Sequence, residues 1–343
     1  MRARELGITI GDLEPGPRNS IADVAATRVG HTTLIEGDDV RTGVSVVIAG
    51  DEPVFAGAHR LNGNGELTGL EWIRESGLLT TPVALTNTHS VGVVRDALVA
   101  AMVARSDPPD WSLPVVGETW DGRLNDVNGF HVRPEHVHAA LETATTDVQE
   151  GNVGGGTGMV CHGFKGGIGT ASRLTGDGHT VGVLVQANHG RRARLQIDGV
   201  PVGKELGPDR IPLPSDVPAG SIIVLVATDA PLLPHQCERI AQRASFGIAR
   251  TGGAGEDSSG DLILAWSTAN KKLEGSDVVA LEMLANDSIN PLFYATIEAT
   301  EEAIVNALLA AETMTGRGIT VERLDPDALV EVMARHGRLA SPS

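Results

Sequence analysis

Residues 255–266 read GEDSSGDLILAW, a polar loop that leads directly into an apolar run. Residues 262–267 have the composition of a buried strand, and the glycine, aspartate and serine before them are typical of a turn that precedes a strand. Ser259 stands at this junction. A serine in such a place usually caps a turn, and the G-x-S-x-G pattern of a nucleophile elbow does not surround it. A catalytic role for Ser259 therefore requires a base from outside that pattern.

The rest of the chain adds further short strands and several longer helices. Strands and helices are mixed without a strict βαβ alternation, which indicates one domain of layered α/β or α+β class. Asn290-Pro291 and Asp325-Pro326 are typical helix starts. The proline-rich residues 199–220 are predicted to form a surface loop. The predicted strands are 44–49, 181–185, 221–227 and 262–267, and the predicted helices are 90–105, 235–248, 290–312 and 325–336.

Charge and composition exclude several classes of protein. The formal net charge is −17, which disfavours binding to nucleic acid or to anionic membranes. No apolar run is long enough to span a membrane, and the amino-terminal residues lack the apolar core of a signal peptide. Two cysteines cannot form a disulfide framework, as is usual in a reducing compartment. We expect a soluble, cytoplasmic protein.

Common cofactor and metal motifs do not account for the chain. The glycine-rich residues 151–169 lack the lysine pattern of a P-loop and a clean dinucleotide fingerprint, so tight turns explain them best. His131, His136 and His138 cluster in sequence, but no carboxylate stands at ligand spacing beside them. The sequence therefore predicts no cofactor and no metal.

A cut before Ser259 would supply the missing base. The new α-amine would belong to Ser259 itself, and such an amine titrates near pH 7.7–8.0, so much of it is neutral at physiological pH. This is the logic of an N-terminal nucleophile activated by its own amine. Ser259 is then a candidate for both self-cleavage and catalysis.

Six segments together resemble one family of enzymes. The chain resembles the self-processing serine aminopeptidases that include L-aminopeptidase D-amidase/D-esterase and the β-peptidyl aminopeptidases, which are hydrolases of the N-terminal-nucleophile (Ntn) type. Each segment alone is weak, but all six occur in order over nearly the whole chain. They are NGNGELTG (62–69), PVVGETWDGRLND (114–126), VGVLVQANHGRR (181–192), GVPVG (199–203), SSGDLILAWSTAN (258–270) and EATEEAIVNAL (298–308).

The resemblance implies an αββα four-layer sandwich, cut between Ser258 and Ser259 into an α chain of residues 1–258 and a β chain of residues 259–343. It also implies a homo-oligomer, a tetramer of αβ heterodimers, that acts on short peptides, amides or esters. Relatives usually have Gly or Asn before the nucleophile, so Ser258 departs from the pattern and is a second candidate nucleophile. Gly260-Asp261 matches the family and favours Ser259.

Further site residues follow from the resemblance. Asn188 matches an asparagine of the family's oxyanion hole, although a strand-end asparagine is ordinarily a turn residue. Thr300 and Glu302 match a hydroxyl and a carboxylate that hydrogen-bond the nucleophile and its amine. Thr296 and Glu298 share that spacing one turn earlier, and a solvated helix face would explain these glutamates equally well.

The substrate pocket is predicted from the segment GETWDG. Glu118 and Trp120 match the region that lines the family's pocket for the substrate amine, where a carboxylate would pair with the ammonium group. Trp120 is alternatively a core residue. Asn62 and Glu66 are weaker candidates for the same cleft.

Two other functions fit the same sequence. A self-cleaving acyltransferase would use the same nucleophile and oxyanion hole, and would pass the acyl group to an amine in place of water. A binding or scaffold protein would keep the fold without the cut. Intact mass separates the scaffold from the two enzymes.

Overall fold

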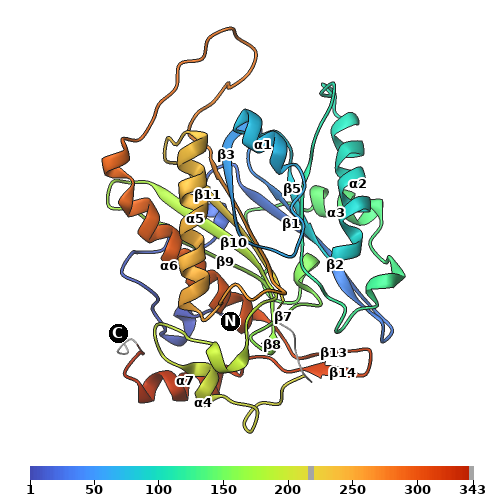
Figure 1. The fold of residues 1–343 in the computed structure, drawn as a ribbon, viewed down its shortest axis with the longest axis vertical. Helices are drawn as coiled ribbons and strands as arrows, with labels where there is room; N and C mark the ends of the chain where they lie inside the picture. Colours follow the sequence, from blue (N-terminus) through green and yellow to red (C-terminus); the bar gives the residue numbers. More distant parts are fainter. Residues whose placement is uncertain (215–219, 340–343) are drawn as a thin grey trace.

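The computed structural model describes residues 1–214 and 220–339. Two β-sheets lie face to face, and helices cover the outer face of each (Figure 1). The four layers match the αββα arrangement expected from the resemblance. Three apolar cores separate the layers: one between the sheets and one beneath each helical layer.

The smaller sheet has the strand order β1-β2-β5-β6, and helices α2 and α3 cover it. The bounds of these elements are β1 Arg28–Glu36, β2 Val40–Ile48, β5 Val83–Thr86, β6 Val115–Glu118, α2 Val91–Val103 and α3 Pro134–Glu142.

The larger sheet has the order β4-β3-β12-β11-β10-β9, and helices α5 and α6 cover its outer face. Its elements are β3 Val54–Gly63, β4 Leu78–Leu79, β9 Gly167–Leu174, β10 Thr180–Ala187, β11 Ile222–Thr228, β12 Gly260–Ser267, α5 Pro234–Arg250 and α6 Asn290–Ala310.

Shorter elements join or extend the layers. They are α1 Leu70–Ser76, α4 Val202–Glu205, α7 Pro326–Arg335, the hairpin of β7 Val160–Cys161 with β8 Phe164–Lys165, and the hairpin of β13 Met314–Gly316 with β14 Ile319–Val321.

The predicted strands and helices are present, with small differences at their ends. The Asp325 side chain caps α7 by accepting a hydrogen bond from the Ala328 amide at 2.8 Å, as the Asp-Pro pair predicts. Helix α6 includes Asn290, so the residue in the cap position is Ile289. Residues 199–220 are not wholly a surface loop, because they contain α4 and the fully buried Val202. Residues 215–219 of that prediction lie outside the described residues.

Strand β12 lies in the interior of the larger sheet. It pairs in parallel with β11, where Ile222 faces Asp261, and antiparallel with β3, where Gly63 faces Gly260. A Cβ at Gly260 would stand 2.4 Å from the carbonyl oxygen of Asn64, so only glycine allows the loop after β3 to approach this closely. The start of β12 is thus held from both sides.

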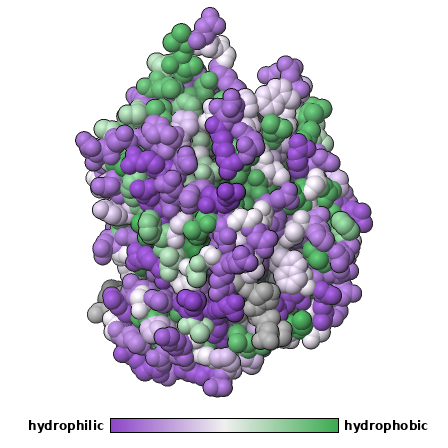
Figure 2. All heavy atoms as spheres, in the orientation of Figure 1, coloured by the Kyte–Doolittle hydropathy of each residue, from purple (hydrophilic) through white to green (hydrophobic). Residues whose placement is uncertain are grey.

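The surface is mainly hydrophilic on the face seen in Figure 2, with apolar residues dispersed over it and a group at the tip of one long loop. That loop carries Val278, Leu281 and Met283, of which Val278 is 86% exposed. In the described ranges, no helix has the length and apolarity to cross a membrane.

Candidate active site

Ser259 lies immediately before β12 and is nearly buried, with 3% of its surface exposed. Its hydroxyl lies within hydrogen-bonding distance of two acceptors, the Gly220 carbonyl oxygen and the Asp261 carboxylate, with Oγ 2.6 Å from Asp261 Oδ1. Residues two apart in a strand share one face, so the extended backbone brings these side chains together. The structure therefore supplies a carboxylate acceptor that our interpretation of the sequence did not assign.

The peptide bond before Ser259 is held by the loop that follows β3. The Asn64 side-chain amide donates to the Ser258 carbonyl oxygen at 2.9 Å, and the Asn64 backbone amide donates to the Ser259 carbonyl oxygen at 3.2 Å. On the other side, the Ser221 hydroxyl accepts from the Gly260 amide at 3.0 Å. An amide donor on the carbonyl that Ser259 would attack is the arrangement that stabilises an oxyanion.

Burial changes the acid–base properties of Asp261. Desolvation raises the pKa of its carboxyl group, and the hydrogen bond from Ser259 opposes this rise. A carboxylate with a raised pKa is a better proton acceptor than an ordinary aspartate. Asp261 can therefore take the proton of the Ser259 hydroxyl.

A cleft of about 490 Å³ opens beside this junction. Predicted pocket residues Glu66, Glu118 and Trp120 line it, and so does Asn188. Trp120 is 44% exposed, so the alternative of a core residue is wrong. The remaining lining residues are Asn64, Gly65, Thr88, Arg123, Val160, Gly220, Ser221 and Ser258. Ser258 thus lines this cleft, whereas Ser259 lines a separate small void with Asp261.

Glu118 is a nearly buried carboxylate in the cleft. It accepts hydrogen bonds from the Thr88 hydroxyl and, at 3.0 Å, from the Glu66 backbone amide. Burial raises its pKa, and these two hydrogen bonds oppose the rise. A substrate ammonium would offset the desolvation of this carboxylate, so Glu118 is suited to bind a free amine.

Asn188 follows β10 and reaches the cleft with a fixed side chain. Its Oδ1 accepts from the Val160 amide at 2.7 Å, and its Nδ2 donates to the Trp120 carbonyl oxygen at 2.9 Å. A side-chain amide nitrogen carries two N–H bonds, so a second donor remains for a substrate oxygen.

Comparison with known proteins places the chain in a family. The model of peptidase family S58 matches residues 19–321. The chain belongs to peptidase family S58.

Relatives in this family cover almost the whole chain. The β-peptidyl aminopeptidase BapA of Sphingosinicella microcystinivorans is 47% identical over 99% of this chain and 93% of its own. A solved β-aminopeptidase from a Burkholderia species has a TM-score of 0.93 at 53% identity, over 98% of this chain and 99% of that one. The L-aminopeptidase D-Ala-esterase/amidase of Ochrobactrum anthropi, a variant of the Ntn hydrolase fold, has a TM-score of 0.92 at 43% identity over 99% of both chains. The predictions of the family, the hydrolase fold and an aminopeptidase are confirmed.

In this S58 chain, neither Thr300 nor Glu302 forms a hydrogen bond with Ser259 among the described contacts. The Thr300 hydroxyl donates to the Thr296 carbonyl oxygen at 2.7 Å, within α6. Glu302 accepts from Arg173 at 2.6 Å, from Arg4 at 3.2 Å and from Asn19. These contacts make Glu302 part of a buried ion-pair network that fixes the amino-terminal segment against α6.

The earlier register on α6 gives the same result. Thr296 donates to the Leu292 carbonyl oxygen at 2.7 Å, and Glu298 accepts from Arg173 at 3.2 Å and from the backbone amides of Asp12 and Leu13. These side chains are buried, so the interpretation of a solvated helix face is wrong as well. Neither pair has a hydrogen bond to the nucleophile among the described contacts.

Proposed function

We propose that this S58 peptidase cuts its own chain between Ser258 and Ser259 and then uses Ser259 as the nucleophile of an aminopeptidase. Two contacts at one peptide bond support the proposal: the Ser259 hydroxyl bonded to Asp261, and the Ser258 carbonyl bonded to Asn64. One contact activates the attacking oxygen and the other polarises the carbon that it attacks.

Self-cleavage then proceeds by an N-to-O shift. Asp261 takes the hydroxyl proton while Ser259 Oγ bonds to the Ser258 carbonyl carbon, and Asn64 stabilises the oxyanion. The C–N bond breaks, the Ser259 nitrogen takes up the proton, and an ester joins the two serines. Water then hydrolyses the ester, which leaves a carboxylate on Ser258 and a free amine and hydroxyl on Ser259.

The cut converts a latent nucleophile into an accessible one. In the uncut chain Ser258 lines the cleft, whereas Ser259 is nearly buried and lines a separate small void. Once the bond is broken, Ser258 is free to leave and the cleft can extend to Ser259. The new α-amine is the general base for substrate hydrolysis, and Asn188 donates to the oxyanion of the substrate.

We further propose that the substrate is a short peptide, amide or ester with a free amine. Glu118 binds the ammonium group, and Trp120 covers the first side chain at the mouth of the cleft. A peptide that begins with a β-amino acid is the favoured substrate, because the relatives of 47% and 53% identity are named β-peptidyl aminopeptidase and β-aminopeptidase.

We also propose that the protein is cytoplasmic and forms a homo-oligomer. Two free, buried cysteines are consistent with a reducing cytoplasm. A homo-oligomer, a tetramer of αβ heterodimers, would give the exposed apolar residues near Val278 a protein surface to contact.

Intact mass of the purified chain tests the cut directly. We expect two fragments, of which the smaller begins at Ser259 when its amino-terminal residues are sequenced. A single species of 35.7 kDa that never divides would contradict self-cleavage.

For the substrate amine, Glu118→Gln should raise KM about tenfold or more for an amine-terminated peptide, since hydrogen bonds to charged groups contribute about 1.5–3 kcal/mol. Equal loss on an N-acetylated peptide would contradict the role of Glu118.

A further inference from the structure

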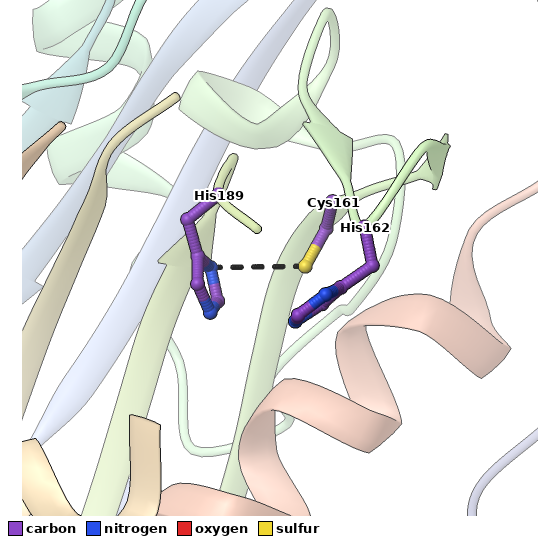
Figure 3. A group of neighbouring side chains, drawn as sticks. All are labelled: Cys161, His162 and His189. Atoms are coloured by element: carbon purple, nitrogen blue, oxygen red, sulfur yellow. Dashed lines mark hydrogen bonds between the residues drawn. The ribbon is translucent and has the colours of Figure 1, made fainter. Parts of the chain in front are cut away.

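Three potential metal ligands meet next to the proposed active site, although the proposed reaction assigns none of them a role. His189 follows Asn188 and lines the small void that also includes Ser259 and Asp261. Cys161 belongs to the β7–β8 hairpin, His162 is in its turn, and His189 follows β10. Figure 3 shows the Cys161 sulfur beside the two imidazole rings, which meet edge to face with their centroids 5.0 Å apart. Cys161 Sγ lies 3.8 Å from His189 Nδ1, and one donor atom from each residue lies within 4.8 Å of the others.

The two imidazoles have nitrogen atoms without a protein partner. Nε2 of His162 and Nε2 of His189 are both buried and accept or donate no hydrogen bond among the described residues. Nδ1 of His162 lies 3.2 Å from the Arg191 carbonyl oxygen, which fixes the proton on Nδ1 and leaves the Nε2 lone pair free. Metal-binding histidines are oriented by this kind of backbone contact.

We propose that Cys161, His162 and His189 bind one soft monovalent metal ion, Cu(I). Thiolate and imidazole are donors that suit copper. Metal–sulfur and metal–nitrogen bonds of about 2.0–2.3 Å require donor atoms to stand about 3.5–4 Å apart, so the 3.8 Å separation already fits and the third donor must move by about 1 Å.

Charge selects the monovalent ion over Zn²⁺. The Arg192 guanidinium donates to the His162 carbonyl oxygen at 3.1 Å, and Lys165 is a second buried basic group near the sulfur. A Cu(I) thiolate is neutral, whereas a Zn²⁺ thiolate adds a positive charge beside these groups. Zn²⁺ usually takes four ligands, so here it would need a water molecule in addition to the three buried side chains.

Binding exchanges one cation for another. Cu(I) replaces the thiol proton of Cys161, which leaves to solvent, and two neutral imidazoles donate lone pairs. No electron is transferred, so no oxidant or reductant is consumed.

The test is an anaerobic titration of the full chain with Cu(I) against a chromophoric Cu(I) chelator. We expect one ion per chain, retained against the chelator. Cys161→Ser should lose this ion, whereas Cys237→Ser should keep it. Cys237 is the matched control, because it is equally buried and free but does not belong to the cluster of Cys161, His162 and His189. The absence of binding by the unmodified chain would overturn the proposal, as would retention of the ion by Cys161→Ser.

Histidine variants and spectroscopy complete the test. His162→Phe and His189→Phe should each weaken Cu(I) binding at least about tenfold. Loss of a residue that only supports a metal ligand already costs about 10–100-fold in affinity, and these histidines are proposed as ligands themselves. His31→Phe should not, although His31 is also a partly buried imidazole with a partnerless Nε2. X-ray absorption of the copper-loaded unmodified chain should show one sulfur and two nitrogen ligands, a result that does not depend on any variant folding. Another ligand set, or one equivalent of Zn²⁺ bound more tightly than Cu(I), would contradict the proposal.

Discussion

The start of β12 and the middle of α6 contain the same two-residue spacing of a hydroxyl and a carboxylate, yet only one of them forms a hydrogen-bonded pair. Ser259 and Asp261 lie 2.6 Å apart, because alternate residues of a strand point to one face. Thr300 and Glu302 diverge, because a helix turns by about 200° over two residues. Thr300 bonds within its helix, and Glu302 bonds to Arg173. A spacing therefore predicts a site only together with the secondary structure that contains it.

The largest effect is expected when the strand hydroxyl is removed. Ser259→Ala should leave one uncut chain of 35.7 kDa without peptidase activity, because both the attacking oxygen and the later nucleophile are lost. Intact mass and a chromogenic peptide assay measure the two losses. Ser258→Ala is the matched control and should still divide. Appearance of a fragment that begins at residue 259 in Ser259→Ala would assign the nucleophile elsewhere.

The next largest effect is expected at the strand carboxylate. Asp261→Asn should slow self-cleavage by about 10²–10⁴, the usual contribution of a general base. The rate is followed by the disappearance of the uncut chain after its synthesis. A variant that divides at the normal rate would show that Asp261 only positions Ser259.

The pH dependence of cutting gives an independent measure of the same group. The base must be deprotonated, and burial raises the pKa of Asp261. The cutting rate of the unmodified chain should therefore fall with decreasing pH already above the ordinary aspartate range. In Asp261→Asn this part of the profile should be flat.

A smaller effect is expected at Asn188, which lines the cleft together with Ser258. Asn188→Ala should lower kcat by about 10²–10³ and leave KM nearly unchanged, since the second N–H strengthens its hydrogen bond only as the substrate carbonyl becomes tetrahedral. Turnover must be normalised to the cut fraction. A higher KM at constant kcat would mean that Asn188 only holds substrate.

The smallest effect on self-cleavage is expected at Glu302 on helix α6. Glu302→Gln should divide at the normal rate, but its free energy of unfolding should fall by about 1.5–3 kcal/mol, because the buried Arg173 loses one of its two carboxylate partners and keeps only Glu298. Denaturant unfolding measures the loss. A folded Glu302→Gln chain that no longer divides would restore the catalytic assignment.

The sequence predicted much of this molecule from local signals. The strand at 262–267, the cap at Asp325 and the serine at the loop-to-strand junction depend on neighbouring residues, and the family segments located the cleft at Glu118 and Trp120. Contacts between distant segments were not predictable in this way. Asn64 reaches the Ser258 carbonyl across 194 residues of chain, and Cys161 meets His189 only because the hairpin folds back on β10. Asp261 could have been predicted, because it stands two residues after Ser259 at the start of a strand. The same two-residue spacing at Thr300 and Glu302 lies on a helix, where it does not bring the side chains together.

Strand β12 has neighbours on both sides, β3 and β11, and both come from the segment before the proposed cut. A separate polypeptide of residues 259–343 would have to insert an interior strand between two others, and its encounter with them would depend on concentration. Within one chain, the bond before Ser259 is a tether that keeps the effective concentration of this strand high while the sheet forms. The tether is no longer needed once the ladder hydrogen bonds are in place. Co-expression of the two fragments should accordingly give far less active enzyme than the intact chain, because folding has to come before the cut.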